Sequence, residues 1–98
     1  MTKKIVASPR AQKDIVNCSV WWMNHHTSRP TAFDDELARV TELILLFPDS
    51  SPAARGVRYK DARVRVLVET GHLLIYRRRG EFITVLAVLA SRAAAQRP

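Results

Sequence analysis

The hydrophobic period of this chain of 98 residues changes once, at a stretch rich in serine, proline and alanine that begins at Asp49. Before that stretch, apolar side chains recur every three or four residues, which is the spacing of one face of an α-helix. After it, they alternate with charged side chains or run continuously, which is typical of β-strands. A chain of this length can bury one hydrophobic core, so we predict a single α+β domain over residues 1–98. We expect the tail, residues 93–98, to fray.

A short strand and a first helix are predicted at the start of the chain. Residues 3–7 contain two adjacent β-branched side chains, which favour a strand. Ser8 and Pro9 then begin a helix, because serine caps the first turn and proline is tolerated at the first helical position. We expect this helix to run to about His26, with one apolar face formed by Ala11, Ile15, Cys18 and Trp22.

A second helix is predicted between Thr31 and Pro48. The pair Arg29-Pro30 breaks the first helix, and Thr31 can cap a new one. Three acidic residues at positions 34–36 lie in its first turns, where the helix dipole favours negative charge. Its apolar stripe consists of Phe33, Leu37, Val40, Ile44 and Phe47. The two helices are joined by a few residues and therefore form an antiparallel hairpin.

The second half of the chain predicts strands at residues 63–68, 72–77 and 81–89, with turns at Gly71 and Gly80. Strands joined by such short turns form an antiparallel meander. The predicted fold is therefore an N-terminal strand, a two-helix antiparallel hairpin, and a three- to four-stranded antiparallel meander.

The faces of these strands follow from alternation. The first strand is expected to place its valines on one face and its arginines on the other: Val64, Val66 and Val68 against Arg63 and Arg65. The last strand is apolar on both faces, with Phe82, Leu86 and Val88 on one and Ile83, Val85 and Leu89 on the other. Two helices cover only one face of a small sheet, so we expect the second face to meet either the chain's own termini or a partner.

All of the excess positive charge lies in the second half. Residues 55–98 contain ten Lys and Arg against three Asp and Glu, a net +7, which equals the formal charge of the whole chain. Nine of the ten are arginine, whose guanidinium pairs with carboxylates and phosphates alike. We interpret this half as a surface for nucleic acid or for an acidic protein, and composition does not choose between them. A solvated surface that only keeps the domain soluble is the simpler alternative.

No catalytic, metal-binding or membrane pattern stands out. Cys18 has no second cysteine and is expected to be a small buried side chain. His25 and His26 end a helix, where the dipole favours a cation, and no third metal ligand accompanies them. His72 follows a turn and is a surface imidazole or a partner contact. We expect no cofactor and no metal, and, without a signal peptide or a membrane-spanning run, a cytoplasmic protein that does not contact a membrane.

Five short features follow one another along nearly the whole chain. They are SPRAQKDI at the first helix start, Phe47-Pro48 after the second helix, Gly56-x-Arg58, HLLIY ending at Tyr76, and VLAVLASR ending at Arg92. In this order they resemble the RelE/ParE toxin superfamily of bacterial type II toxin–antitoxin modules. The resemblance implies a cytoplasmic toxin that inhibits growth until an antitoxin covers it, and the antitoxin is expected to be ParD-like with an acidic C-terminal segment.

The superfamily divides by target. RelE-like members cut messenger RNA on the ribosome, whereas ParE-like members act on DNA gyrase. This chain has Leu73 where an arginine commonly follows the hairpin glycine of the nucleases, Ala90 where many members carry histidine, and no tyrosine after Arg92. The resemblance therefore favours a ParE-like gyrase inhibitor that is not an enzyme. The alternatives are a RelE-like ribosome-dependent mRNA endonuclease and a non-toxic relative that only binds an antitoxin.

The resemblance also suggests site residues. Target-binding residues are expected among the basic side chains Arg58, Arg63, Arg65, Arg77, Arg78, Arg79 and Arg92. If the chain is a nuclease, the expected catalytic residues are Arg63, Arg65 and Arg92. Antitoxin-binding residues are expected among Ile15, Trp22, Val40, Ile44, Tyr76, Phe82 and Leu86. An arginine surface alone lacks a general acid or base, because a guanidinium stays protonated.

Overall fold

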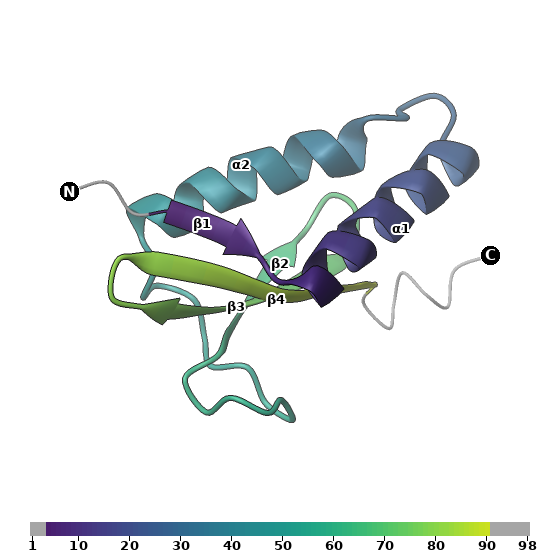
Figure 1. Cartoon of the computed structure of the whole chain (residues 1–98). Coiled ribbons are helices and arrows are strands. Elements are labelled where there is room, and N and C mark those ends of the chain that lie inside the picture. Colours follow the sequence, from purple (N-terminus) through teal and green to yellow (C-terminus); the bar gives the residue numbers. More distant parts are fainter. Residues whose placement is uncertain (1–3, 91–98) are drawn as a thin grey trace.

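Two helices lie across one face of a four-stranded sheet in the computed structural model, which describes residues 4–90 (Figure 1). The elements in chain order are β1 (Lys4–Ala7), α1 (Pro9–His25), α2 (Ala32–Leu46), β2 (Arg63–Leu67), β3 (His72–Arg79) and β4 (Phe82–Ala90). The predicted α+β order is therefore confirmed. No helix in residues 4–90 is long and apolar enough to cross a membrane. The predictions for residue 3, Arg92 and the tail lie outside the described residues.

The sheet is mixed. Its strand order is β1-β4-β3-β2, and the three later strands form the predicted antiparallel meander. The N-terminal strand pairs in parallel with β4, from Lys4 opposite Phe82 to Ala7 opposite Val85. The last strand of residues 4–90 is thus an inner strand, which the order of elements in the sequence did not indicate.

The helices begin and end close to the predicted positions. The Ser8 side chain accepts from the Ala11 N–H at 3.1 Å and donates to the Leu86 carbonyl at 3.3 Å, so this cap also ties α1 to β4. Thr31 precedes α2 as expected, but its side chain accepts no hydrogen bond from the first turn, and its hydroxyl donates to the Asp35 carboxylate at 3.1 Å. Phe47, expected in the apolar stripe of this helix, lies just past its end and is exposed.

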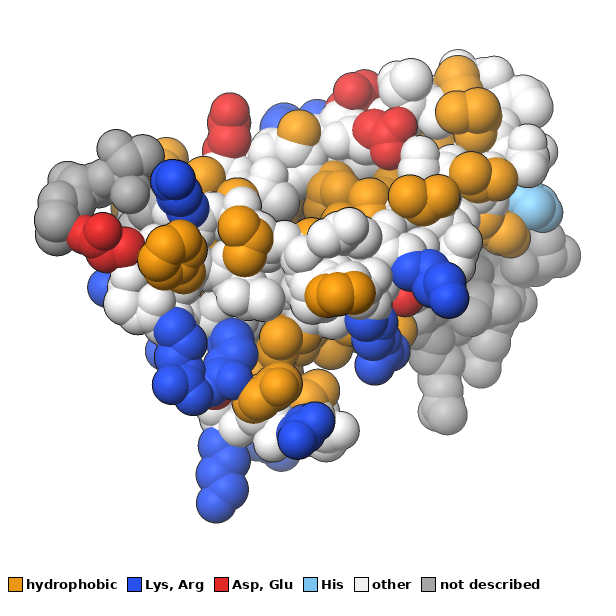
Figure 2. Space-filling model, viewed as in Figure 1, with side chains coloured by type: hydrophobic (Ala, Val, Ile, Leu, Met, Phe, Trp, Pro, Cys, Tyr) orange, Lys and Arg blue, Asp and Glu red, His pale blue; other side chains and the backbone are white. Residues whose placement is uncertain are grey.

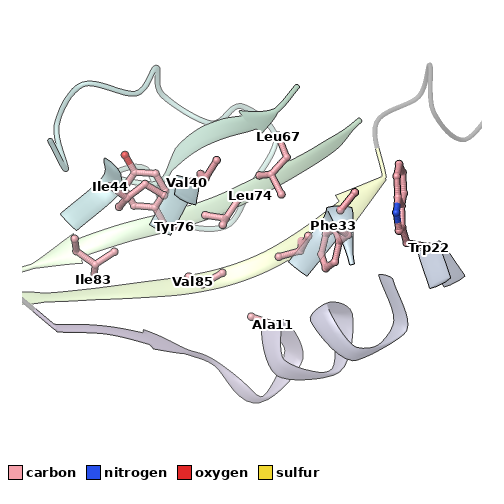
Figure 3. Close-up of a cluster of buried hydrophobic side chains, with 12 residues drawn as sticks. Ala11, Trp22, Phe33, Val40, Ile44, Leu67, Leu74, Tyr76, Ile83 and Val85 are labelled. Atoms are coloured by element: carbon pink, nitrogen blue, oxygen red, sulfur yellow. The ribbon is translucent and has the colours of Figure 1, made fainter. Parts of the chain in front are cut away.

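The main core lies between the helices and the sheet. Side chains from α1, α2, β2, β3 and β4 meet there, as Figure 3 shows. Trp22 closes one end of this core, and its indole N–H donates to the Arg29 carbonyl at 2.8 Å in the loop between the helices. The largest fully buried side chains of the chain are Tyr76, Phe33, Ile44, Leu67, Leu74 and Ile83.

A buried polar network joins α2 to the turn between β2 and β3. Glu36 accepts from the N–H of Glu69 at 2.7 Å, the N–H of Thr70 at 3.0 Å and the Thr70 hydroxyl at 2.7 Å. The same hydroxyl lies 3.0 Å from Nδ1 of His72, which is 3% exposed. His72 is therefore neither a surface imidazole nor an accessible partner contact, and Glu36 has a structural role beyond first-turn charge.

The second face of the sheet is partly covered by the connection between α2 and β2, residues 47–62. Val57 and Tyr59 of this connection pack with Ala62 against Ile75 and Ala87 of the sheet. The expectation named only the termini or a partner as cover for this face, and it missed this connection, which covers part of it. Figure 1 shows the connection below the sheet, opposite the helices.

A β-bulge changes which side chains of β4 face the helices. Ile75 pairs with Ala87 and Tyr76 pairs with Val85, which leaves Leu86 as an extra residue. Beyond the bulge the alternation is shifted by one, so Val88 joins Ile83 and Val85 in the helix-facing core, while Leu89 lines the other face. The predicted shared face of Ile83 and Val85 is confirmed, and the predicted faces of Val88 and Leu89 are wrong. In β2, Leu67 is the buried residue, whereas Val68 is past the strand and 81% exposed.

Candidate functional site

Arg63 fastens the start of the connection 47–62 to the sheet. Its Nη1 donates to the carbonyl of Asp49 at 3.0 Å and to the carbonyl of Ser51 at 2.6 Å. On the neighbouring strand, the Tyr76 hydroxyl donates to the carbonyl of Pro48 at 2.9 Å inside the core. One nitrogen of the Arg63 guanidinium is therefore engaged by two backbone oxygens of its own chain.

The first arginine of the triplet 77–79 holds the end of the same connection. Its guanidinium lies over the Tyr59 ring, 4.1 Å from the centroid, and Nη2 donates to the Asp61 carboxylate at 3.1 Å. Only 13% of the Arg77 side chain is exposed. This hydrogen bond is the main cause that lowers the pKa of Asp61 below its ordinary value. Arg77 is thus a structural side chain of the loop.

The other two arginines of the triplet also meet aspartates of the connection. Arg78 donates through Nη1 to the Asp49 carboxylate at 2.8 Å and through Nε to the Gly80 carbonyl at 3.1 Å. Arg79 lies 3.6 Å from the Asp61 carboxylate. The dense charge at the hairpin tip therefore has an internal explanation, because all three arginines brace residues 47–62 against the sheet.

Three of the predicted target-binding arginines form no ion pair among residues 4–90: Arg58, Arg63 and Arg65. Arg63 donates to backbone carbonyls instead. Arg55 and Lys60 of the connection also form no ion pair among these residues. Arg58 is exposed, and Arg65 is half-buried on β2 opposite Leu74. Figure 2 shows Lys and Arg side chains on the lower side of the molecule, where the connection lies in Figure 1. Arg92 lies outside the described residues.

An open groove of about 580 Å³ lies on the sheet face opposite the helices. The sheet contributes its apolar floor, the connection contributes Val57 and Tyr59, and Arg10 and Arg58 lie at its edges. Gly56 has φ of +73°, a left-handed conformation that glycine adopts without strain and that lets the connection turn here. The sequence reasoning missed Arg10, Val57 and Tyr59 as lining residues, although an apolar and aromatic pair beside a turn glycine in a polar loop is a usable signal.

Comparison with known proteins gives the family. Residues 5–94 match the family described as the ParE toxin of the type II toxin–antitoxin system parDE. The chain belongs to the ParE toxin family. No match is found among curated proteins.

Solved structures agree on the fold of this ParE-family toxin. It is similar to the chromosomal ParDE toxin–antitoxin system of P. aeruginosa, with a TM-score of 0.75 at 11% identity, over 93% of this chain and 98% of that chain. The YafQ–DinJ toxin–antitoxin complex of E. coli gives 0.65 at 16% identity, over 99% of this chain and 100% of that chain. The isolated E. coli RelE toxin gives 0.63 at 19% identity, over 92% and 85%. At these identities the likeness shows the fold alone.

The fold of this toxin buries some of the residues expected to contact an antitoxin and leaves others accessible. Trp22, Val40, Ile44 and Tyr76 belong to the core in Figure 3 and offer almost no surface to a partner. Ile15 packs against the same core, Leu86 lines the groove, and Phe82 is 55% exposed. Of the seven, Phe82 and Leu86 therefore remain the accessible candidates.

The toxin also has an exposed apolar stripe that the sequence reasoning missed. Val16, Val20 and Met23 lie on the outer side of α1, and Trp21 beside them stacks on His25 with ring centroids 4.2 Å apart. Their spacing of four and three residues repeats the helical period of the buried face. This second set of helical spacings is visible in the sequence and could have identified the stripe.

The candidate nuclease residues are not joined by a proton-transfer group. Arg63 binds backbone carbonyls, Arg65 is unpaired, and Arg92 lies outside the described residues. His72 on β3 is buried, and burial lowers its pKa, so it is held as a neutral imidazole. Within residues 4–90, no group of three His, Cys, Asp or Glu side chains could hold a metal ion. The described surface can bind anions, and its arginines stay protonated.

Proposed function

We propose that this chain is the toxin of a type II toxin–antitoxin module that inhibits bacterial growth by poisoning DNA gyrase and that a cognate ParD-like antitoxin neutralises it. Membership of the ParE family supports the first part. The observation that supports the choice of gyrase concerns the sheet: Arg63 donates through Nη1 to two backbone carbonyls, and His72 is buried with a pKa that burial lowers. A surface of this kind can bind an acidic or phosphate-bearing target. It is poorly suited to general acid–base cleavage of RNA, because its guanidinium groups stay protonated.

The target contacts in this proposal are the cations that the fold leaves unpaired. Arg58 on the connection and Arg65 on β2 are the two from the predicted set, and Arg55 lies on the same connection. An unpaired guanidinium retains its hydrogen-bond donors for a carboxylate or a phosphate. Arg77 is excluded as a direct contact, because its side chain is packed against Tyr59 and Asp61.

One series of assays tests gyrase and the ribosome as targets. The purified chain is incubated with gyrase and plasmid, and separately with ribosomes translating a defined message. We expect gyrase-dependent DNA breaks, an intact message, and about a tenfold weaker effect for Arg58→Gln with Arg65→Gln, the order expected when two exposed ion pairs are lost. The matched control is Arg29→Gln with Arg39→Gln, which removes the same charge from the loop between the helices and from α2, where both arginines lie near the Glu69 carboxylate.

Two results would contradict the proposal. Cleavage of the message on the ribosome without an effect on gyrase would assign the chain to the RelE-like activity. Absence of both activities from the folded chain would leave an antitoxin-binding relative without toxicity.

A further inference from the structure

We propose that the Asp61 carboxylate occupies an anion-binding site between Arg77 and Arg79, and that an oligophosphate group that displaces it releases the connection 47–62 from the sheet. Asp61 is then an internal competitor that keeps the connection closed until such an anion is present. The inference goes beyond the proposed function, because it concerns a change of shape within the chain and holds whichever target the toxin has.

Two guanidiniums converge on one carboxylate oxygen at this site. Arg77 donates through Nη2 to Oδ2 of Asp61 at 3.1 Å, and Nε of Arg79 lies 3.6 Å from the same oxygen. The two arginines are alternate residues of β3, so their side chains leave the strand on the same face. Guanidinium groups bind phosphate oxygens as readily as they bind carboxylates. The site therefore matches a phosphate group, and the chain fills it with one of its own carboxylates.

The site has more positive charge than Asp61 offsets. The guanidinium of Arg58 lies 5.7 Å from the centroid of the Tyr59 ring, and that of Arg77 lies 4.1 Å from the same centroid. Arg58 forms no ion pair among residues 4–90, and Nε of Arg77 is buried without a hydrogen-bond partner in that range. Three arginines against one aspartate leave a net charge of +2, which an anion with several phosphate groups neutralises more fully than Asp61 does.

The ligand is recognised through its phosphates and not through a base. A base stacks on an aromatic ring only when one face of the ring is open, and Arg77 already lies over the Tyr59 ring. An anion with a single charge is also unsuited. Asp61 is tethered beside its arginines, which gives it an effective concentration on the order of millimolar. An oligophosphate carries several negative charges at neutral pH, so it can compete with a tethered carboxylate where acetate cannot.

Asp61 is well placed to control the connection. The next residue, Ala62, is fully buried and packs against Ile75 and Ala87 of the sheet. Backbone hydrogen bonds of 2.9 and 3.2 Å join Ala62 to other residues of the connection. Residues 54–62 form no helix or strand, so few contacts besides these hold the segment in place. Removing Asp61 from its arginines therefore loosens the segment that covers Ile75 and Ala87.

The ion pairs of Asp61 are weak enough for an anion to replace them. Its side chain is 47% exposed and that of Arg79 is 70% exposed, so water and salt screen this pair. Only 13% of the Arg77 side chain is exposed, and its guanidinium becomes reachable when Asp61 leaves. The incoming anion therefore contacts Arg79 first and Arg77 after the carboxylate has moved.

Trypsin reports the release, because Arg55, Arg58 and Lys60 lie within the connection. The full chain is digested briefly with sodium tripolyphosphate, or with sodium sulfate at the same ionic strength, and the products are quantified by mass spectrometry. We expect cleavage after these three residues to be about tenfold faster with tripolyphosphate and unchanged with sulfate, because cleavage follows the population of the opened segment. Cleavage after Lys13 on α1 is the internal reference.

Isothermal titration calorimetry with tripolyphosphate locates the site. Asp61→Asn should bind the anion about tenfold more tightly and be cleaved rapidly without it, because the internal competitor is lost. Asp34→Asn removes the same charge from an exposed position of α2 and should change binding by less than about twofold. Arg79→Gln should weaken binding about tenfold, whereas Arg39→Gln on α2 should weaken it by less than about twofold.

Each contrary result overturns the inference. Equal tightening by Asp61→Asn and Asp34→Asn would mean that only net charge matters. Binding that Arg79→Gln does not weaken would remove the site, and cleavage that tripolyphosphate does not accelerate would remove the release. A deoxythymidine oligonucleotide of the same charge that binds more tightly than tripolyphosphate would make this a nucleic-acid surface.

Two features keep the test decisive. Because the Arg79 side chain is 70% exposed, Arg79→Gln gives a result even if Asp61→Asn does not fold. The assays contain no gyrase, so their failure is separate from a failure of the proposed function.

Discussion

Replacing Glu36 by glutamine keeps the shape of the side chain and removes one acceptor from a buried turn. Oε1 accepts from the N–H and the hydroxyl of Thr70 at 3.0 and 2.7 Å, and Oε2 accepts from the Glu69 N–H at 2.7 Å. An amide has one acceptor oxygen and one NH2 group, so in either orientation the NH2 faces at least one backbone N–H. An unpaired buried donor costs about 1–3 kcal/mol, and we therefore expect a free energy of unfolding about 2 kcal/mol lower.

Urea unfolding followed by circular dichroism measures this difference. For a domain of this size, about 2 kcal/mol corresponds to a melting temperature lower by roughly 10 °C. Glu42→Gln is the matched control, because Glu42 lies on the same helix and is exposed, and it should stay within about 0.5 kcal/mol of the parent. If Glu36→Gln unfolds at the same urea concentration as Glu42→Gln, the hydrogen bonds of Glu36 do not hold the turn and the reasoning is refuted.

Further predictions concern the braced connection and the buried imidazole. Arg77→Ala should lower the free energy of unfolding by about 1–2 kcal/mol because it removes a packed cation–π contact, whereas Arg79→Ala, 70% exposed, should lower it by less than about 0.5 kcal/mol in the same urea assay. Because burial lowers the pKa of His72, the unfolded chain takes up a proton first. Stability should fall as the pH drops below the ordinary value of 6.5, and His72→Leu should flatten this slope in melting curves recorded from roughly pH 7 to 5. Asp61→Asn should speed hydrogen exchange of the amides in residues 54–62 relative to the parent at neutral pH, and unchanged exchange would count against the brace.

The change of hydrophobic period was sufficient to predict the order of the elements. Ser8-Pro9 located the start of α1, and Gly71 and Gly80 located the two turns of the meander. These signals act over a few residues and depend little on tertiary contacts, so they could be recognised from the sequence alone. The parallel pairing of β1 with β4 joins residues far apart in the chain, and no local pattern reports it.

The faces of Val88 and Leu89 in β4 were mispredicted because alternation assumes an unbroken ladder. The bulge at Leu86 inserts one residue and shifts Val88 to the helix side. Nothing in a continuous apolar run marks where such an insertion falls, since every residue in it is compatible with either face.

The composition of the sequence could not assign roles to individual arginines. The sequence shows their number, but Arg63, Arg77 and Arg78 are distinguished from Arg58 only by carbonyls and aspartates that a folded connection brings to them. Asp49 and Asp61 lie in loop segments whose path is set by tertiary packing. Composition therefore indicated the basic half of the chain, while the division between bracing and unpaired cations came from the structure.

The position of β4 inside the sheet governs when this protein can acquire its shape during synthesis. Residues Phe82 to Ala90 are made after the other three strands of this sheet, yet they separate β1 from β3 and supply the partner for both. Until they leave the ribosome, β1 has no neighbour and the helices have only part of a sheet to pack on. Domains generally fold as units, and contacts of such long sequence separation form slowly. A nascent chain that stops before β4 therefore has no complete groove, because Leu86, Ala87 and Leu89 of its floor are missing.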